Sequence, residues 1–136
     1  MERGGLNRVV DAVLGSAGPG GHVIWDWNGT LLADVDHAID VMNQLLDERG
    51  MPRLDRERYT SVFDFPVRRY YDALGFDYGQ ETFESLCHRF MERFMAGVSR
   101  LRLFPQMEAA VLELKERGLV QSILSATEQQ RLETMI

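Results

Sequence analysis

Residues 22–31, with the sequence HVIWDWNGTL, constrain the fold more than any other part of the chain. An apolar run leads directly into Asp26, and the pair Asn28-Gly29 follows after one further residue. Such a run bounded by turn-forming residues predicts a short buried strand, and Asn-Gly predicts a tight turn behind it. We therefore expect Asp26 at the carboxyl end of a strand, where open parallel sheets bind their ligands.

A second strand is predicted near the other end of the chain. Residues 119–124 are largely apolar and run directly into Ser125. A helix is predicted before this strand, over residues 105–117, because a proline stands at its start and a glycine just past its end. After the strand, Thr127 and Gln130 form a capping-box pattern, which predicts a final helix that reaches the last residue.

Between the two predicted strands the pattern is helical throughout. Residues 36–100 place apolar side chains three and four positions apart and show no strand pattern. Asp36 and Asp55 are expected to cap helices, and Pro66 is expected to start one. The predicted helices of this stretch cover residues 36–49, 55–63, 67–74 and 80–96. One more helix is predicted ahead of the first strand, over residues 4–16.

This order of elements predicts an α/β fold that is interrupted by helices. Residues 1–35 and 101–136 carry the strand and helix patterns of a partial α/β core domain, and residues 36–100 form an inserted helical domain. The chain supplies only two core strands, and so small a sheet is marginal by itself.

Composition narrows the classes of protein that fit. The net charge of −6 argues against generic nucleic-acid binding. The single cysteine, Cys87, excludes an internal disulfide and a cysteine-rich metal site. No apolar run approaches the roughly 18 residues that a membrane span needs. We expect a cytoplasmic protein with neither nucleic acid nor membrane as a partner.

Residues 22–31 resemble motif I of the haloacid dehalogenase (HAD) superfamily, in which apolar residues precede Asp-x-Asp-Gly-Thr. Asp26, Gly29 and Thr30 match this pattern, whereas Asn28 stands where the phosphatase members carry a second aspartate. The helical insert resembles a C1-type cap domain. Residues 103–125 resemble the stretch around motif II in the phosphoglycolate phosphatase-like branch. The resemblance implies a Rossmannoid core with a parallel sheet, a helical cap, and a hydrolase that uses Mg²⁺.

The resemblance also assigns roles to individual residues. A strand-end carboxylate can be a nucleophile, a metal ligand or a turn cap, and the family pattern implies that Asp26 is both nucleophile and Mg²⁺ ligand. By the same resemblance Asn28 takes the general acid/base position, and its backbone carbonyl would be the second metal ligand. Thr30 is expected to hydrogen-bond Asp26. Ser125 and Ala126 are expected to bind phosphate, because N–H groups at a helix start attract anions.

Asn28 leaves three interpretations open, because a carboxamide cannot exchange a proton as an aspartate does. In the first, which we favour, the protein is a phosphatase of a small phosphorylated metabolite that uses a good leaving group or another acid such as Asp34. In the second it is a dehalogenase- or phosphonatase-type hydrolase, whose reaction needs no acid there. In the third it is a non-catalytic protein that binds a phospho-ligand or a partner.

Two further features bear on activity. Arg68 and Arg69 in the cap suit a substrate carboxylate or phosphate, although each also fits an ordinary solvated helix face. The family in addition requires a lysine and an acidic pair after Ser125, but the only lysine, Lys115, precedes it. We expect a missing C-terminal segment or a second chain to complete the core, and this truncated 136-residue chain to be inactive alone.

Overall fold

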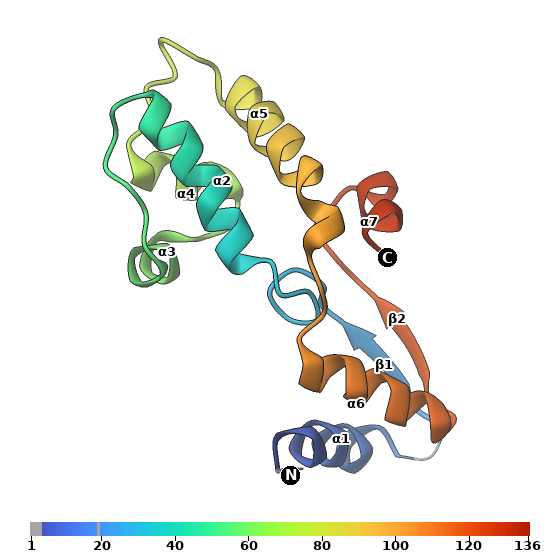
Figure 1. The fold of residues 1–136 in the computed structure, drawn as a ribbon. Helices are drawn as coiled ribbons and strands as arrows, with labels where there is room; N and C mark the ends of the chain where they lie inside the picture. The colour runs from blue at the N-terminus through green and yellow to red at the C-terminus, as the bar shows by residue number, and fades with distance from the viewer. Residues whose placement is uncertain (1–3, 19) are drawn as a thin grey trace. The chain divides into compact units, whose positions relative to one another are not determined.

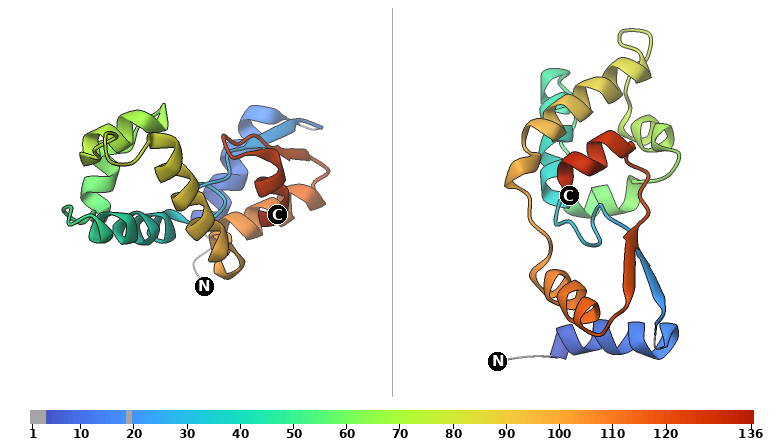
Figure 2. Two further views of the ribbon diagram at one scale, coloured as in Figure 1. Left: turned by 90° about the horizontal axis from the view of Figure 1, so that it is seen from above. Right: turned by 90° about the vertical axis from the view of Figure 1, so that its right-hand side faces the viewer.

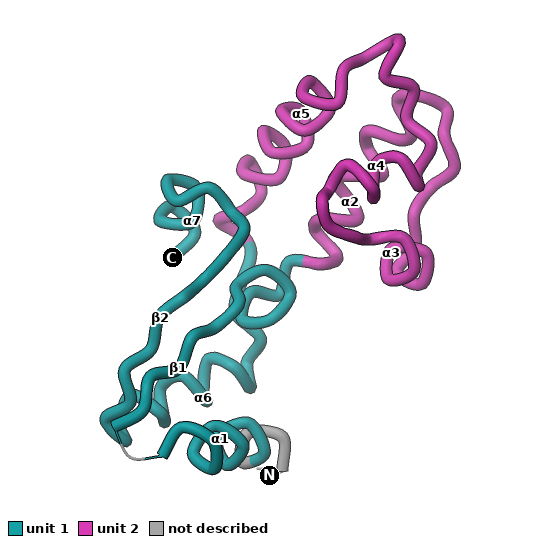
Figure 3. Tube along the Cα trace, turned by 180° about the vertical axis from the view of Figure 1, so that it is seen from behind, with its two compact units in different colours: residues 1–34, 101–136 teal, residues 35–100 magenta. Residues whose placement is uncertain are grey.

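The structure is a computed structural model that describes residues 4–18 and 20–136. It divides into two compact units (Figure 3). The first comprises the chain up to Asp34 together with Leu101–Ile136, and the second comprises Val35–Arg100. Among the described residues, no helix has both the length and the apolar character needed to cross a membrane.

The first unit is built on two parallel strands, β1 (His22–Trp25) and β2 (Val120–Ile123), which run side by side in Figures 1 and 2. His22 lies opposite Val120, and Trp25 lies opposite Ile123. The amide of Leu124 donates to the Trp25 carbonyl over 2.9 Å, so the pairing continues one residue beyond β2. Both predicted strands are thus confirmed, and they end side by side.

Three helices complete this unit, namely α1 (Gly4–Ala17), α6 (Pro105–Glu116) and α7 (Gln129–Met135). α1 packs against α6, and they share an apolar core with β1. The buried residues of this core are Val10, Ala110, Leu114 and Leu119. The opposite face of the sheet is open in this unit, since Ile24 and Val120 are 61% and 60% exposed. The alternation of exposed and partly buried residues along both strands shows that helices cover one face only.

The second unit is entirely helical. It contains α2 (Val35–Glu48), α3 (Arg56–Val62), α4 (Val67–Leu74), α5 (Phe83–Ala96) and the short 3₁₀ helix η1 (Val98–Arg100). Its core includes Met42, Leu45, Leu46, Tyr71 and Leu86. Residues 35–100, all of which are described, contain no strand, as predicted.

Local signals fix several helix ends. Asp55 caps α3 as predicted, because its carboxylate accepts from the Arg58 amide over 2.7 Å. Gly75 ends α4 with a φ of +94°, a conformation that glycine adopts without strain. α4 itself begins directly after Pro66. The mixed α/β architecture with a parallel sheet and a helical insert is therefore the one expected.

Three predicted helix starts are wrong. α2 begins at Val35, so Asp36 lies inside its first turn and pairs with Arg56 over 2.8 Å instead of capping the helix. α5 begins at Phe83 and not at residue 80, because the Thr82 hydroxyl accepts from the Ser85 amide over 3.1 Å.

The third error concerns α7. Glu128 and not Thr127 precedes its first residue, and Glu128 makes no side-chain capping bond. The Thr127 hydroxyl instead donates to the side-chain oxygen of Asn28 over 2.8 Å. A tertiary partner has displaced the local capping box, and this partner belongs to the candidate site.

Candidate active site

Asp26 directly follows β1, and both oxygens of its carboxylate are held. Oδ1 accepts from the Trp27 amide over 2.8 Å, and Oδ2 accepts from the Thr30 hydroxyl over 3.1 Å. The side chain is exposed. The predicted contact between Thr30 and Asp26 is therefore present, and it fixes an accessible carboxylate at the end of a strand.

The turn behind Asp26 is tight and well anchored. The amides of Thr30, Leu31 and Leu32 all donate to the Trp27 carbonyl, over 3.2, 3.1 and 3.0 Å. Gly29 has a φ of +73°, which a side chain there would strain. Trp27, Leu31 and Leu32 are almost fully buried and form one cluster. The turn is thus fastened by its own apolar side chains, and it holds Asp26 in a defined place.

Backbone hydrogen bonds also tie this turn to the segment that leads into α6. The Phe104 amide donates to the Leu31 carbonyl over 2.9 Å, and the Ala33 amide donates to the Arg102 carbonyl over 2.9 Å. The residues on either side of the helical insert are thereby joined within the first unit.

Asn28 connects the loops that follow the two strands. Its Nδ2 donates to Asp34 Oδ2 over 2.7 Å, while its Oδ1 accepts from Ser125 over 3.3 Å and from Thr127 over 2.8 Å. The Thr127 amide donates to Ser125 Oγ over 3.1 Å. The orientation of the amide follows from chemistry, because a flipped Asn28 would set two acceptor oxygens against each other at Asp34.

The structure therefore brings Asp26, Asn28, Thr30 and Ser125 together as two bonded pairs at the carboxyl ends of the strands. Ala126 follows Ser125 and is exposed. The helix expected at Ser125 begins only at Gln129, so phosphate binding there would rest on the loop and not on a helix start.

Sequence reasoning missed Thr127 as a site residue. It lies two positions after Ser125, but its capping-box pattern offered a local role that concealed the tertiary one. The sequence suggests Asp34 only as a substitute acid. Its buried position beside the Asn28 amide could not be read from the sequence.

The oxygen atoms at the site suit Mg²⁺ in kind. The Asp26 carboxylate and the Asn28 backbone carbonyl are hard oxygen donors, and Mg²⁺ commonly takes one or two protein ligands, with water and substrate phosphate as the others. Within the described ranges, no group of three or more His, Cys, Asp or Glu side chains could hold a metal ion. The residues present therefore fit a metal that is only partly coordinated by protein.

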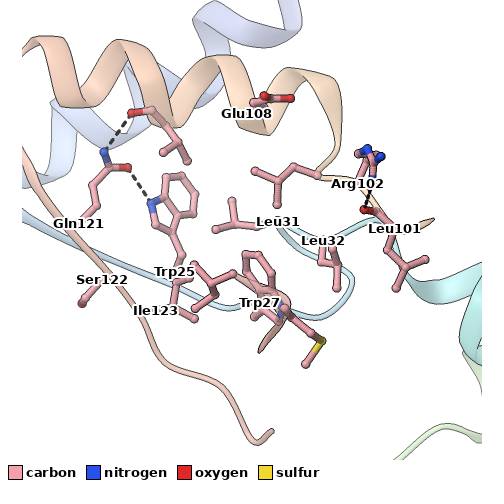
Figure 4. A pocket seen from close by; sticks show the side chains of 14 residues that line it. Trp25, Trp27, Leu31, Leu32, Leu101, Arg102, Glu108, Gln121, Ser122 and Ile123 are labelled. Carbon is pink, nitrogen blue, oxygen red and sulfur yellow. Dashed lines mark hydrogen bonds between the residues drawn. The ribbon is translucent and has the colours of Figure 1, made fainter. Parts of the chain in front are cut away.

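An apolar cavity of about 430 Å³ lies beside the site in the first unit (Figure 4). Trp25 and Trp27 line it, together with residues of β2 and α6. Trp25 Nε1 donates to Gln121 Oε1 over 2.9 Å, and Gln121 Nε2 donates to the Val111 carbonyl over 3.0 Å. Neither Asp26 nor Ser125 lines this cavity, so it is distinct from the place where the polar groups meet.

The two arginines of the second unit have local partners. The Arg68 guanidinium lies 4.8 Å from the centre of the Tyr78 ring and 5.4 Å from that of Phe83, a cation–π arrangement. Arg69 lies 3.5 Å from Asp64 and remains 69% exposed.

Comparisons with known proteins identify relatives of the chain. The profile of the family described as haloacid dehalogenase-like hydrolase matches residues 23–136. A candidate phosphoglycolate phosphatase from Lactobacillus plantarum has a similar structure, with a TM-score of 0.69 and 16% identity over 85% of this chain and 54% of that one. CbbY from Rhodobacter sphaeroides, solved in complex with phosphate, gives a TM-score of 0.61 and 16% identity over 84% and 54%.

The two solved structures are each 16% identical to this chain, and a likeness at this identity shows the fold alone. This chain spans about half of their length, 54% in each case. No curated protein matches it. The family profile covers most of the chain. The fold of the chain is similar to that of the solved structures. The chain therefore belongs to the haloacid dehalogenase-like hydrolases.

Proposed function

We propose that this protein is an Mg²⁺-dependent phosphatase of a small phosphorylated metabolite, with Asp26 as the nucleophile. The observation that carries the proposal is the placement of Asp26. Its exposed carboxylate is held at the end of β1 by Thr30 and the Trp27 amide, and Asn28 joins that turn to Ser125. Membership of the hydrolase family and the phosphate complex of CbbY support phosphate as the ligand.

In the proposed reaction an Asp26 oxygen attacks phosphorus, the bond to the leaving oxygen breaks, and an aspartyl-phosphate forms that water then hydrolyses. The hydrogen bonds from Trp27 and Thr30 restrict rotation of the carboxylate and so favour attack. Mg²⁺, held by Asp26 and the Asn28 carbonyl, would supply positive charge against the anionic substrate.

Ser125 and Ala126 would bind the phosphoryl oxygens. The Ser125 hydroxyl now donates to Asn28 over 3.3 Å, which is a long and weak hydrogen bond. It can therefore turn toward a phosphoryl oxygen at small cost. Arg68 and Arg69 are proposed contacts for the rest of the substrate. Arg69 is the more available of these two, because Arg68 is stacked on aromatic rings.

One observation favours a second candidate function, a protein that binds a phospho-ligand without turning it over. Both ends of the Asn28 carboxamide are occupied by hydrogen bonds, and the group holds no acidic proton.

We also expect the 136-residue chain alone to show no significant turnover, because its one lysine precedes Ser125.

Turnover measurements test the proposed function and separate the two candidates. The complete gene product, with and without Mg²⁺, is assayed on acetyl phosphate and p-nitrophenyl phosphate beside its Asp26→Asn and Asp11→Asn variants. Asp11 is exposed on α1 and serves as the matched control. We expect Mg²⁺-dependent turnover that only the Asp26 substitution abolishes. Phosphate binding without turnover would support the second candidate. Robust turnover by the 136-residue chain would contradict its expected inactivity.

A further inference from the structure

Asn28 makes three side-chain hydrogen bonds, which is more than a turn residue needs. Asp34 accepts one of them and is buried, with 4% of its surface exposed. A carboxylate at this depth requires donors, and the Asn28 amide supplies one at 2.7 Å. The pair is therefore a built feature of the turn.

The direction of the Asn28 amide has a consequence on its other side. Because Nδ2 is committed to Asp34, Oδ1 must face the loop after β2, where it accepts from Ser125 and Thr127. These two hydroxyls lie at sequence separations of 97 and 99 residues from Asn28. A single carboxamide thus ties the second loop of the site to the first, mainly through the 2.8 Å bond from Thr127.

We propose that Asn28 is a positioning residue that Asp34 orients, and that it holds Ser125 and Thr127 in the arrangement that receives a phosphoryl group. This inference rests on the proposed function and adds Thr127 and Asp34 to the site. It gives Asn28 a role that needs no proton transfer. In this protein the carboxylate lies at position 34, and an amide stands between it and the hydroxyls.

The pair can be tested by exchanging its members. Asn28→Asp alone places two carboxylates within about 2.7 Å of each other, so they repel. Asp34→Asn alone removes the charged acceptor that orients Asn28. The double variant Asn28→Asp with Asp34→Asn restores one amide–carboxylate bond of reversed polarity, and its carboxylate at position 28 still accepts from both hydroxyls. We expect each single variant to melt several degrees lower and the double variant to recover most of that loss.

Binding of inorganic phosphate supplies the functional readout. Titrations of the complete gene product followed by NMR are expected to show at least tenfold weaker binding for Asn28→Ala and several-fold weaker binding for Thr127→Val. The exchanged double variant should bind within a few-fold of wild type. Thr134→Val is the control, because Thr134 is an exposed threonine of α7 whose hydroxyl donates only locally, to the Gln130 carbonyl. The side-chain NH₂ of Asn28 should give a shifted, slowly exchanging proton that Asp34→Asn removes.

The outcomes separate this inference from the proposed function. Phosphate binding that Asn28→Ala and Thr127→Val leave unchanged would overturn the positioning role while the proposed function stands. If wild type binds no phosphate, the proposed function fails and the positioning role fails with it, even where the exchange restores stability. An exchanged variant that remains as unstable as the single variants would overturn the pairing itself.

Discussion

At the scale of a single residue, Asn28 cannot act as the general acid in the proposed reaction. A general acid contributes about 10²- to 10⁴-fold to a rate, and the carboxamide has no proton to give. We expect kcat/KM of the complete gene product to fall steeply as the pKa of the leaving alcohol rises. Acyl and aryl phosphates should therefore react far faster than alkyl phosphates. Rates across a series of esters check this, and a flat dependence would show that another group protonates the leaving oxygen.

A second prediction at this scale concerns two glycines with opposite surroundings. A Cβ atom at Gly97 would lie 2.4 Å from His37 Cε1, and His37 is held by a 2.9 Å contact with the Phe94 carbonyl. Gly15 lies inside α1, and a Cβ atom added there would meet no other heavy atom within 4 Å. We expect Gly97→Ala to lower the free energy of unfolding by about 1–3 kcal/mol. Gly15→Ala should raise it by about 0.5–1 kcal/mol. Urea unfolding measures both, and equal effects would contradict the described packing.

The sequence predicted single residues well where the role is local. The placement of Asp26, its contact with Thr30 and the cap at Asp55 follow from neighbours a few positions away. The sequence pattern predicts Thr127 as a helix cap, because its actual partner, Asn28, is 99 residues distant. Partnerships of that kind depend on tertiary structure, which a local pattern does not encode.

At the scale of elements, the two-stranded sheet leaves an apolar face uncovered in the first unit. One face exposes Ile24, Val120 and Leu124, the last of these by 72%. A contiguous apolar surface and free strand edges favour association. We expect the 136-residue chain to self-associate as its concentration rises, and Ile24→Thr with Val120→Thr to reduce this. Sedimentation velocity is the measurement. Leu112→Gln on α6, 56% exposed, is the control, and a wild-type chain that stays monomeric would contradict the prediction.

Glu81 stabilises the helical unit through an ion-pair cluster. It accepts from Arg49 and, over 2.6 Å, from Arg89, and the hydrogen bonds from Arg49 are the main reason that its pKa lies below the ordinary 4.5. A lowered folded-state pKa gives stability that is present above the ordinary value and lost as pH falls through the folded one. We therefore expect Glu81→Gln to lower the melting temperature at pH 7 and to have a smaller effect at pH 3. Asp40→Asn, at an exposed position of α2, should show no such trend. A Glu81→Gln effect that is the same at both pH values would contradict the role of its charge.

The types and order of the elements could be predicted, because the hydrophobic periodicity agrees with the positions of helix-starting and helix-ending residues over most of the chain. α4 begins after Pro66 and ends at Gly75 as the sequence indicates. The sequence predicts the start of α5 three residues too early, because Thr82 and not an earlier residue makes the capping bond. Boundaries depend on which of several capable side chains forms the cap, and the sequence pattern alone does not decide that.

At the scale of the whole molecule, the order of the predicted strands and helices was sufficient to predict the fold class. Two strand patterns around a helical insert predicted the α/β architecture, and the family resemblance implied a parallel sheet. The observed parallel pair and the family profile over residues 23–136 agree with both. The pairing register and the covering of one sheet face could not be predicted, because they depend on how α1 and α6 pack. The chain spans 54% of the length of each solved structure. The reaction is therefore a proposal for this chain, which the measurement below tests.

The central claim is that Asp26 accepts the phosphoryl group. Beryllofluoride mimics a phosphoryl group on a carboxylate, so ¹⁹F NMR of the complete gene product with beryllofluoride and Mg²⁺ tests the claim most directly. The account predicts bound fluorine resonances that require Mg²⁺, persist in Asp11→Asn and vanish in Asp26→Asn. Bound resonances that survive in a folded Asp26→Asn variant, or none in the wild-type protein, would contradict it.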